Sequence, residues 1–574
     1  MNAVDQGLAH VIRHRPSATD SQVEVAPRIT RSTTLAITGG LFGLALMMRL
    51  WAVASISFPL TEGSAYYVAV ARNLVTGRGL EIDAIWSYAT PPLTLPRPAF
   101  ELWQPLASFV AAVPMTMLGP TFSTAQLGFA VLGALLAPLT WLVARDVARR
   151  LELPSRRAWS MSIGAGLLAG LSGPLLLSSA LPDSALPFTI LTVVACLVMP
   201  SAAAGRQTGV VVLGAVLGLA YLTRMEAVYL GLAFLIVATL TAIDLTPTAR
   251  IRRTAVLALG VGAVGALVAL PWWLRNLAVF GSPTPGQVVD NLLLVRNEQI
   301  FAYAHRPTLD AFLAQGAPEL LAKVAAAAVH NLVNVLVVPL GPLAVVGLLT
   351  LIVGPARIPK APLADVARGP LGTLLIFGAI AFAATTLLFP VATLWGTFEH
   401  AAGPLVIGLI VAAAVGADAF VARVRSWRNW PRSNAWLAPA ALILVTLPLT
   451  ALQVSAADMQ ASNRERLITQ IAESVPVALE TAGVDPRAPL IGDRPVWLSG
   501  AMDRPVIVLP DEPAADVLRL ATDFGAQAVI ISEARGIHPA ALRSDGAGAA
   551  CFVELTAADL PAGTAVFRLV DGCR

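Results

Sequence analysis

Residues 59–86 read PLTEGSAYYVAVARNLVTGRGLEIDAIW and open a stretch of mixed polarity, 58–106, in a chain that is otherwise mostly apolar. The stretch follows the first long hydrophobic run. It interleaves charged and aromatic side chains: Glu62, Arg72, Arg78, Glu81, Asp83, Arg97 and Glu101, with Tyr66, Tyr67, Trp86, Tyr88 and Trp103. A protein that only spans a bilayer has no need of such a segment, so we expect the chemistry of this protein to centre on it.

The composition places the rest of the chain in a membrane. Of 574 residues, 56% are hydrophobic and only 13% are charged, and the mean hydropathy is +0.72. Soluble globular proteins have roughly 25% charged residues. Apolar runs of about twenty residues recur, which is the length that a helix needs to cross a bilayer. The sequence therefore predicts a polytopic α-helical membrane protein.

We expect about eleven transmembrane helices. The predicted spans are 35–57, 123–144, 159–180, 185–203, 209–223, 227–244, 255–273, 331–353, 371–389, 402–420 and 435–453. Residues 105–118 are apolar but too few to cross comfortably, so we expect them to lie on or dip into the outer interface.

Basic residues set the expected orientation. They gather in alternate loops, on the same side of the membrane as the Arg-bearing tail 1–33. The four loops contain Arg145, Arg149, Arg150, Arg156 and Arg157; Arg250, Arg252 and Arg253; Arg357, Lys360 and Arg368; and Arg423, Arg425, Arg428 and Arg432. The positive-inside rule then puts the N-terminus in the cytoplasm, as a disordered tail. The loops 58–106 and 274–330 and the C-terminal segment lie outside. The net charge of +4 is dispersed in this way, which is not the pattern of a nucleic-acid-binding protein.

The last 120 residues or so differ in character from the transmembrane domain, 34–454. Residues 455–574 alternate short buried-looking strands with a helix that begins near Glu512, which predicts a small extracytoplasmic α/β domain. Cys551 and Cys573 flank a predicted hairpin and can pair outside the cytoplasm, or remain free. Cys196 lies in a predicted span.

Glu62 is the first candidate for chemistry. We expect Ser64 to cap a helix over residues 65–74, which places Glu62 at the helix entrance near the outer interface. Glu62 is either a general base facing a cleft or a solvated loop acid. Asp83 is the second candidate, as a ligand for an acceptor or for a divalent metal, with the same solvated alternative. No other cofactor is expected.

Several charged residues lie near the outer ends of the predicted spans. Arg49 within the first span either faces the bundle interior or an aqueous cavity, or extends to the interface. Asp183, Arg224 and Glu226 occupy short outer turns, where they either share one external cavity or pair locally.

Arg275 follows the seventh span and either meets a lipid phosphate or anchors the chain at the headgroups. His400, at the outer end of the tenth span, either assists phosphate binding or is structural.

Three motifs resemble one family. Residues 61–80 (TEGSAYYVAVARNLVTGRGL), 220–230 (AYLTRMEAVYL) and 271–283 (PWWLRNLAVFGSP) are similar, in order and spacing, to stretches of GT-C membrane glycosyltransferases of the protein O-mannosyltransferase and lipid A aminoarabinose transferase type. The likeness covers residues 35–420. Where those proteins usually have an acidic pair in the first external loop, this chain has Thr61, Glu62 and Gly63.

The resemblance implies a function at the outer face of the cell membrane. Glu62 would be the catalytic carboxylate, and the donor would be a sugar on a polyprenyl phosphate, transferred with inversion. Arg275, Arg224 and His400 would stabilise the phosphate, and the motif tyrosines Tyr66 and Tyr67 are candidate substrate contacts. The expected partners are this donor, membrane lipids and an acceptor that is a protein, lipid or glycan.

A secondary transporter or lipid flippase is the alternative, with the charged residues lining a pathway. A transporter built from related halves would show internal repeats, and none is evident by eye in the sequence. A scaffold that presents the C-terminal domain would leave the stretch 58–106 without a purpose.

Overall fold

The computed structural model describes residues 30–353, 368–430, 434–556 and 560–573. Most of the predicted tail, and Arg357 and Lys360, lie outside these ranges. Eight helices of the described residues are long and apolar enough to cross a membrane: Arg31–Ser55 (α1), Phe122–Arg150 (α4, Phe122–Ala134, and α5, Leu136–Arg150), Ala185–Ala203 (α8), Pro247–Phe280 (α11), Gly316–Leu340 (α14, Gly316–Val329, with η3 and α15), Pro370–Leu387 (α18), Gly403–Arg428 (α20) and Leu437–Thr481 (α21). The predicted multi-pass helical architecture is confirmed.

Shorter and broken helices complete the bundle. The helices α6 (Ser155–Leu171) and α7 (Gly173–Ala180) form a pair bent by 46° that counts as a ninth candidate span. Shorter apolar helices are α3 (Leu106–Leu118), α9 (Gln207–Tyr221), Met225–Thr241 (η1 and α10, Val228–Thr241) and α16 (Pro342–Val353).

The predicted span 331–353 is interrupted in the structure. The helix Gly316–Leu340 ends before Gly341, whose φ is +54°, and α16 begins at Pro342. Proline lacks the N–H that would continue the helix, and glycine adopts the positive φ at little cost, so the two residues together break the span.

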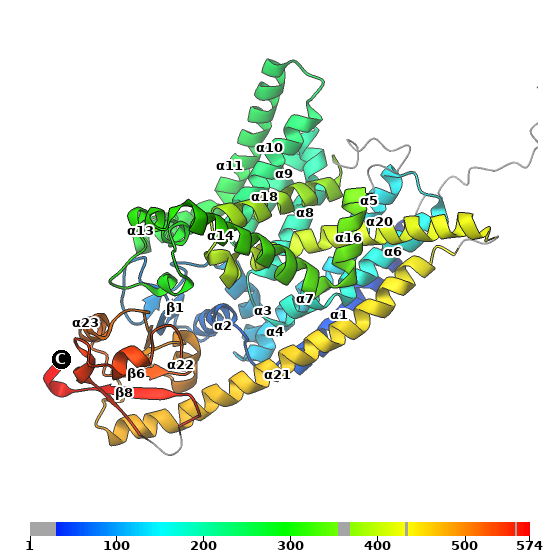
Figure 1. The fold of residues 1–574 in the computed structure, drawn as a ribbon. Coiled ribbons are helices and arrows are strands. Elements are labelled where there is room, and N and C mark those ends of the chain that lie inside the picture. Colours follow the sequence, from blue (N-terminus) through cyan, green and yellow to red (C-terminus); the bar gives the residue numbers. More distant parts are fainter. Residues whose placement is uncertain (1–29, 354–367, 431–433, 557–559, 574) are drawn as a thin grey trace, which may run out of the picture.

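A six-stranded sheet lies beyond one end of the bundle (Figure 1). Its strand order is β2-β5-β4-β6-β8-β7, in which β2, β5, β4 and β6 run parallel and β8 and β7 are antiparallel additions. The strands are Ala84–Ile85 (β2), Leu490–Gly492 (β4), Val506–Val508 (β5), Ala528–Ile531 (β6), Phe552–Glu554 (β7) and Ala565–Leu569 (β8). The helices α22 (Pro495–Met502) and α23 (Ala514–Phe524) connect the parallel strands.

The two faces of this sheet belong to different cores. Leu490, Val506 and Ala528 pack into the large core that continues into the bundle through the stretch 58–106, which is the predicted first external loop. Their neighbours Ile491 and Ile507 point to the other face and pack with α23. Side chains alternate between the faces of a strand, so the sheet joins the membrane helices to the outer layer of the domain.

The first external loop contributes a strand to the C-terminal sheet. Ala84 and Ile85 (β2) pair in parallel with Val506 and Ile507 of β5. The loop also carries α2 (Glu62–Val75), and its strands β1 (Glu81–Ile82) and β3 (Arg97–Pro98) pair with each other. The loop and the C-terminal domain are therefore one structural unit.

One helix links this unit to the bundle. The helix α21 runs without a break from Leu437 to Thr481, and Figure 1 shows it crossing from the bundle to the sheet. The predicted domain boundary at residue 455 thus falls inside a continuous helix.

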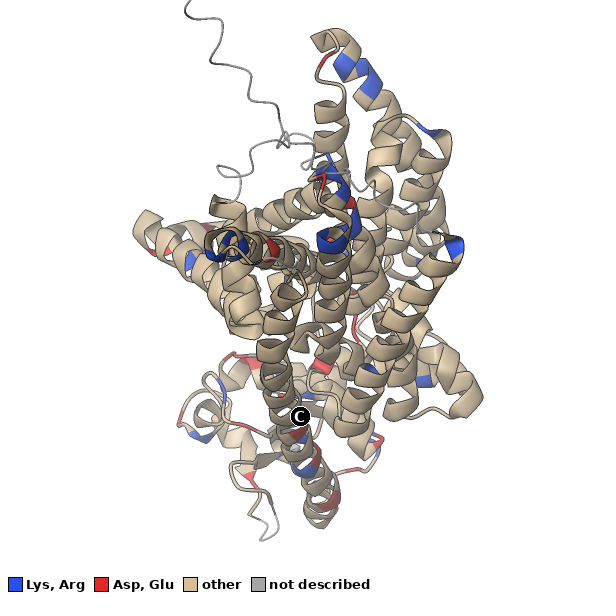
Figure 2. Cartoon of the chain, turned by 90° about the vertical axis from the view of Figure 1, so that its right-hand side faces the viewer, with Lys and Arg blue, Asp and Glu red and all other residues tan. Residues whose placement is uncertain are grey.

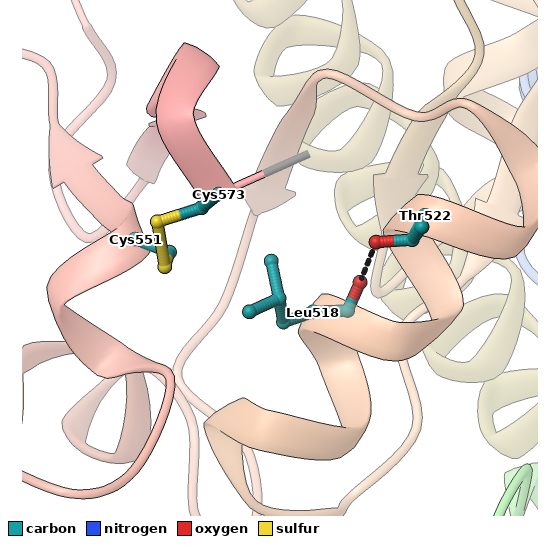
Figure 3. Close-up of a disulfide and its surroundings, with 4 residues drawn as sticks. All are labelled: Leu518, Thr522, Cys551 and Cys573. Atoms are coloured by element: carbon teal, nitrogen blue, oxygen red, sulfur yellow. Dashed lines mark hydrogen bonds between the residues drawn. A yellow bond between two sulfur atoms is a disulfide. The ribbon is translucent and has the colours of Figure 1, made fainter.

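A disulfide closes the C-terminal hairpin. Cys551, just before β7, is bonded to Cys573, just after β8, beside Leu518 of α23 (Figure 3). Cys196 is a buried free thiol in α8.

Candidate active site

Glu62 is the first residue of α2. The N-cap is Thr61, whose Oγ1 accepts a hydrogen bond from the backbone N–H of Ser64 at 3.1 Å. The prediction that Ser64 caps a helix from residue 65 was therefore wrong by three residues. Both residues are good N-caps, and the Thr61 position starts the helix at the carboxylate itself.

The carboxylate of Glu62 reaches the C-terminal domain. Its Oε1 accepts the backbone N–H of Trp497 in the first turn of α22, at 3.0 Å. Burial raises the pKa of Glu62 to about 7, although the N–H groups of Trp497 and Val496 and the charge of Arg494 favour the ionised form. A carboxylate with this pKa suits proton transfer near neutral pH.

Asp183, in the turn between α7 and α8, lies next to this helix start. A Cβ atom added at Gly63 would lie 3.2 Å from Oδ2 of Asp183, so the glycine lets the two segments approach closely. Oδ1 of Asp183 accepts hydrogen bonds from the hydroxyl of Ser184 and from the backbone N–H of Ala185. The structure thus brings a second carboxylate to the residue that follows Glu62.

His400 forms an ion pair with Asp183. It lies in α19 (Thr397–Ala401); its Nε2 is 3.5 Å from Oδ2 of Asp183, and its Nδ1 is 2.6 Å from the carbonyl oxygen of Gly396. Burial alone would lower the pKa of His400, but the charge of Asp183 outweighs it and raises this pKa to about 9. The partner effect is reciprocal, since His400 holds the pKa of Asp183 well below its usual range despite burial. His400 is therefore a cation at neutral pH.

Arg224 connects to the same group of residues. Its Nη1 donates to Ser184 at 2.8 Å, and its Nη2 donates to Glu226 at 2.6 Å. Burial, followed by the charge of Asp183, raises the pKa of Tyr67 well above its usual range. The local pairing of Arg224 with Glu226 is therefore present, and the hydrogen bond to Ser184 also brings Arg224 to the residue that follows Asp183 in the chain.

Arg275 lies on a helix rather than in a loop. The helix α11 continues to Phe280 and ends at Gly281, which has a φ of +71°, so the predicted loop begins later than residue 274. Nη2 of Arg275 donates to the carbonyl oxygen of Ala99 at 2.8 Å, and the guanidinium lies over the ring of Trp272.

Tyr66 supports the first external loop from within. It is 1% exposed, and its hydroxyl accepts the N–H of Phe100 at 2.6 Å and lies 3.4 Å from Glu101. Near Tyr66, Arg97 is fully buried and donates to the carbonyl oxygens of Ser87 and Thr90. Burial of this arginine could not be predicted from its residue type.

Asp83 and Arg49 make contacts of their own, separate from those of Glu62. Both carboxylate oxygens of Asp83 accept from Arg78 at 2.7 Å, on the outside of the loop. Arg49 is fully buried in the bundle, where it donates to Ser179 and to the carbonyl oxygen of Gly170 at the bend between α6 and α7. These contacts favour structural roles for both residues.

A metal site was also considered for this region. Within the part of the chain that the structure describes, no group of three or more His, Cys, Asp or Glu side chains is arranged to hold a metal ion. Glu62 and Asp183 thus do not belong to a recognisable ligand set, and we derive no step through a metal.

Solved structures with a similar fold span most of the chain. The oligosaccharyltransferase of Archaeoglobus fulgidus in its apo form matches with a TM-score of 0.52 and 14% identity, over 87% of this chain and 70% of that one. ArnT from Cupriavidus metallidurans in the apo state matches with a TM-score of 0.50 and 15% identity, over 94% of this chain and 99% of that one. Both are GT-C glycosyltransferases. The chain has a GT-C fold.

The likeness is one of structure rather than of sequence. No family model matches the chain, and a comparison with curated proteins found no similar sequence. The GT-C resemblance inferred from three motifs is nevertheless confirmed, because the matched structures share the fold over almost the whole chain.

Proposed function

We propose that this protein is a membrane glycosyltransferase that moves a sugar from a polyprenyl-phosphate donor to an acceptor at the outer face of the cell membrane. One observation carries the proposal: in a chain with a GT-C fold, the first external loop holds Glu62, whose pKa burial raises to about 7, and the next residue, Gly63, closely approaches Asp183 of the Asp183–His400 pair. The donor class rests on the motif resemblance. The acceptor is a protein, lipid or glycan; the oligosaccharyltransferase with this fold has been solved with a tethered acceptor peptide.

Glu62 acts as the general base in this proposal. It takes the proton of an acceptor hydroxyl as that oxygen attacks the anomeric carbon from the face opposite the phosphate. The bond between the anomeric carbon and the phosphate oxygen breaks, the configuration inverts, and polyprenyl phosphate leaves. Such a positioned base contributes about 10²–10⁴-fold to the rate. A phosphate ester is already a good leaving group, so a strong general acid is unnecessary.

Cations near the departing phosphate supply the remaining stabilisation. Arg224 is the leading candidate, because within the described residues its buried Nε has no hydrogen-bond partner while both terminal nitrogens are engaged. His400 is the second candidate, although Asp183 balances its charge in the ion pair. We place Tyr67 on the substrate side with them, whereas Tyr66 supports the first loop from within and Arg275 holds that loop to α11.

Two observations support an outward-facing site. Figure 2 shows many of the basic residues at the end of the bundle away from the C-terminal domain, as the positive-inside rule requires for a cytoplasmic end. The disulfide lies at the other end, on the side of Glu62, and disulfides persist in oxidising compartments. A lipid-linked donor then enters sideways from the membrane while its sugar reaches the outer loops.

The test offers the purified protein a panel of polyprenyl-phosphate sugars with protein, lipid and glycan acceptors, and measures release of polyprenyl phosphate. Release that depends on one donor, with transfer of its sugar, is the expected result. If no donor is consumed and a labelled solute or lipid crosses proteoliposomes instead, the protein is a transporter and the proposal is wrong.

A further inference from the structure

The helix α22 of the C-terminal domain touches the carboxylate on which the proposed function rests. It follows β4 through Asp493 and Arg494 and begins at Pro495. The N–H of Trp497 donates to Oε1 of Glu62, as described above, and the charge of Arg494 acts on the same carboxylate. The C-terminal domain therefore contributes groups to the immediate surroundings of Glu62.

Arg494 is held in place by two contacts, an ion pair and an aromatic ring. Its Nη2 donates to Oε2 of Glu533 at 2.9 Å, and the other oxygen of Glu533 accepts from Arg464 of α21 at 3.0 Å. Both guanidinium groups lie over the ring of Trp497, with their central carbons 4.7 Å (Arg464) and 5.4 Å (Arg494) from its centre. A planar guanidinium that is paired and stacked in this way has little freedom to turn.

The Trp497 ring fixes this arrangement against the membrane domain. The side chain is only 4% exposed and packs on Phe58, at the end of the first transmembrane segment, with ring centres 6.3 Å apart. The cluster of Arg464, Arg494, Trp497 and Glu533, which we call the α22 clasp, thus joins the last span, the C-terminal domain and the first external loop at Glu62.

We propose that the α22 clasp is a working part of the catalytic site, in which Arg494 and the N–H of Trp497 position Glu62 and keep it ionised as the base. This inference rests on the proposed function. Arg494 is a positioning residue, since it acts on the substrate only through Glu62.

The charges around Glu62 give the direction of the effect. Burial opposes ionisation of Glu62, and so does the nearby charge of Asp493, while Arg494 and the first N–H groups of α22 favour it. Asp183 and its partner His400 face the next residue, Gly63. Arg464 is also stacked on Trp497, but Arg494 is the cation whose charge acts on Glu62, and it directly precedes the helix that binds this carboxylate. Removal of Arg494 therefore leaves the carboxylate of Glu62 more easily protonated.

The experiment measures the pH profile of kcat/KM for sugar transfer by the full-length protein carrying Arg494→Gln. We expect the acidic limb of the profile to move to higher pH by about one unit. At pH values below the limb, activity then falls about tenfold, while above it activity returns toward that of the wild type. The KM for the donor changes little, because Arg494 does not touch the donor.

Arg494→Lys keeps the charge and is expected to restore most of the profile, although not the stacking on Trp497. The matched control is Arg543→Gln, which removes an arginine of the same domain that pairs with Glu554 at the surface; its profile should equal that of the wild type. If Arg494→Gln does not fold, Arg494→Met keeps the aliphatic stem and gives the same measurement.

An equal loss of activity at every pH, or an unmoved limb, overturns the inference and assigns the clasp a structural role only. The proposed function fails by a different result: no donor is consumed by the wild type, or Glu62→Gln retains full activity. The two failures are therefore distinguishable.

Discussion

At the scale of single residues, Glu62 combines burial with nearby positive groups. Burial raises its pKa to about 7, and Arg494 and the N–H groups of α22 limit that rise. The residue is therefore partly ionised at neutral pH, which is the condition for a general base that must also give up its proton after each turnover.

The pH dependence of the rate follows from this value. Glu62 must be ionised to accept a proton, so kcat/KM should rise about tenfold per pH unit below pH 7 and level off about one unit above it. Steady-state rates of polyprenyl phosphate release across pH 5 to 9 check this. A profile that falls with rising pH through this range would mean that Glu62 does not act as the base.

Residue 63 has to be a glycine because a side chain there would crowd Asp183. Gly63→Ala would place a methyl group about 3.2 Å from Oδ2 of Asp183, which pushes that carboxylate and its His400 partner away. We expect transfer to fall by about tenfold or more, because small displacements of catalytic groups are costly, while stability is kept, since alanine favours helices.

The control for this change is Gly39→Ala in α1, where an added Cβ meets nothing within 4 Å. Its activity should equal that of the wild type. Full activity in Gly63→Ala would show that the closeness of α2 to Asp183 has no role in transfer.

At the scale of elements, the sequence distinguishes the stretch 58–106, between α1 and α3, from the apolar runs around it, but it does not indicate which segments this stretch contacts. A mixed-polarity stretch in an apolar chain is a local signal. Ala84 and Ile85 pair with β5, which lies more than 400 residues later in the chain. This pairing could not be predicted, because a strand of two residues is too short to show a sequence pattern. The same holds for the hydrogen bond between Glu62 and Trp497, which depends on how α22 is placed by the sheet.

Helix packing also determines which of the charged candidate residues lie close together. Asp183 was recognised in an outer turn, and only the approach of α2 to that turn brings it to Gly63. Arg49 and Asp83 have the same residue types as functional candidates, but their hydrogen bonds go to the bend between α6 and α7 and to Arg78. Residue type and spacing could not separate these cases.

Several carboxylates of the C-terminal domain bind the segment that follows α11, and one of them, Glu512, binds its backbone. Glu512, 4% exposed, accepts the consecutive backbone N–H groups of Tyr303, Ala304 and His305 at 2.8 to 3.0 Å. Glu512→Ala leaves these donors without a partner, so we expect the free energy of local opening to fall by about 2 kcal/mol.

Hydrogen exchange checks this expectation. The three amides should exchange about 30-fold faster in the Glu512→Ala protein, and Glu319→Ala, an exposed change on α14, should leave them unaltered. Unchanged protection in the Glu512→Ala protein would mean that the loop is held by its other contacts.

At the scale of the whole molecule, the membrane bundle and the C-terminal domain share one continuous core. Composition and hydropathy were sufficient to predict the helical membrane part. The boundary at residue 455 was drawn where the apolar run ends, but α21 continues to Thr481 because its later turns pack against the outer domain rather than lipid.

The disulfide should stabilise this whole arrangement. Cys551 and Cys573 are 22 residues apart, and closing a loop of that size stabilises a domain by about 3 kcal/mol. The double Cys→Ser variant should therefore unfold at a lower denaturant concentration, and its transfer activity should be lost with the C-terminal domain, because α22 holds Glu62. Activity that survives unfolding of that domain would contradict the shared site.

The most direct measurement compares the wild type with Glu62→Gln in single-turnover release of polyprenyl phosphate from a donor that the wild type consumes. Glutamine keeps the size of the side chain and an oxygen for the N–H of Trp497, but it cannot take a proton at this pH. Glu554→Gln serves as the control at an exposed ion pair. We predict that Glu62→Gln binds the donor normally and releases polyprenyl phosphate at least 100-fold more slowly; release at the wild-type rate would contradict the account.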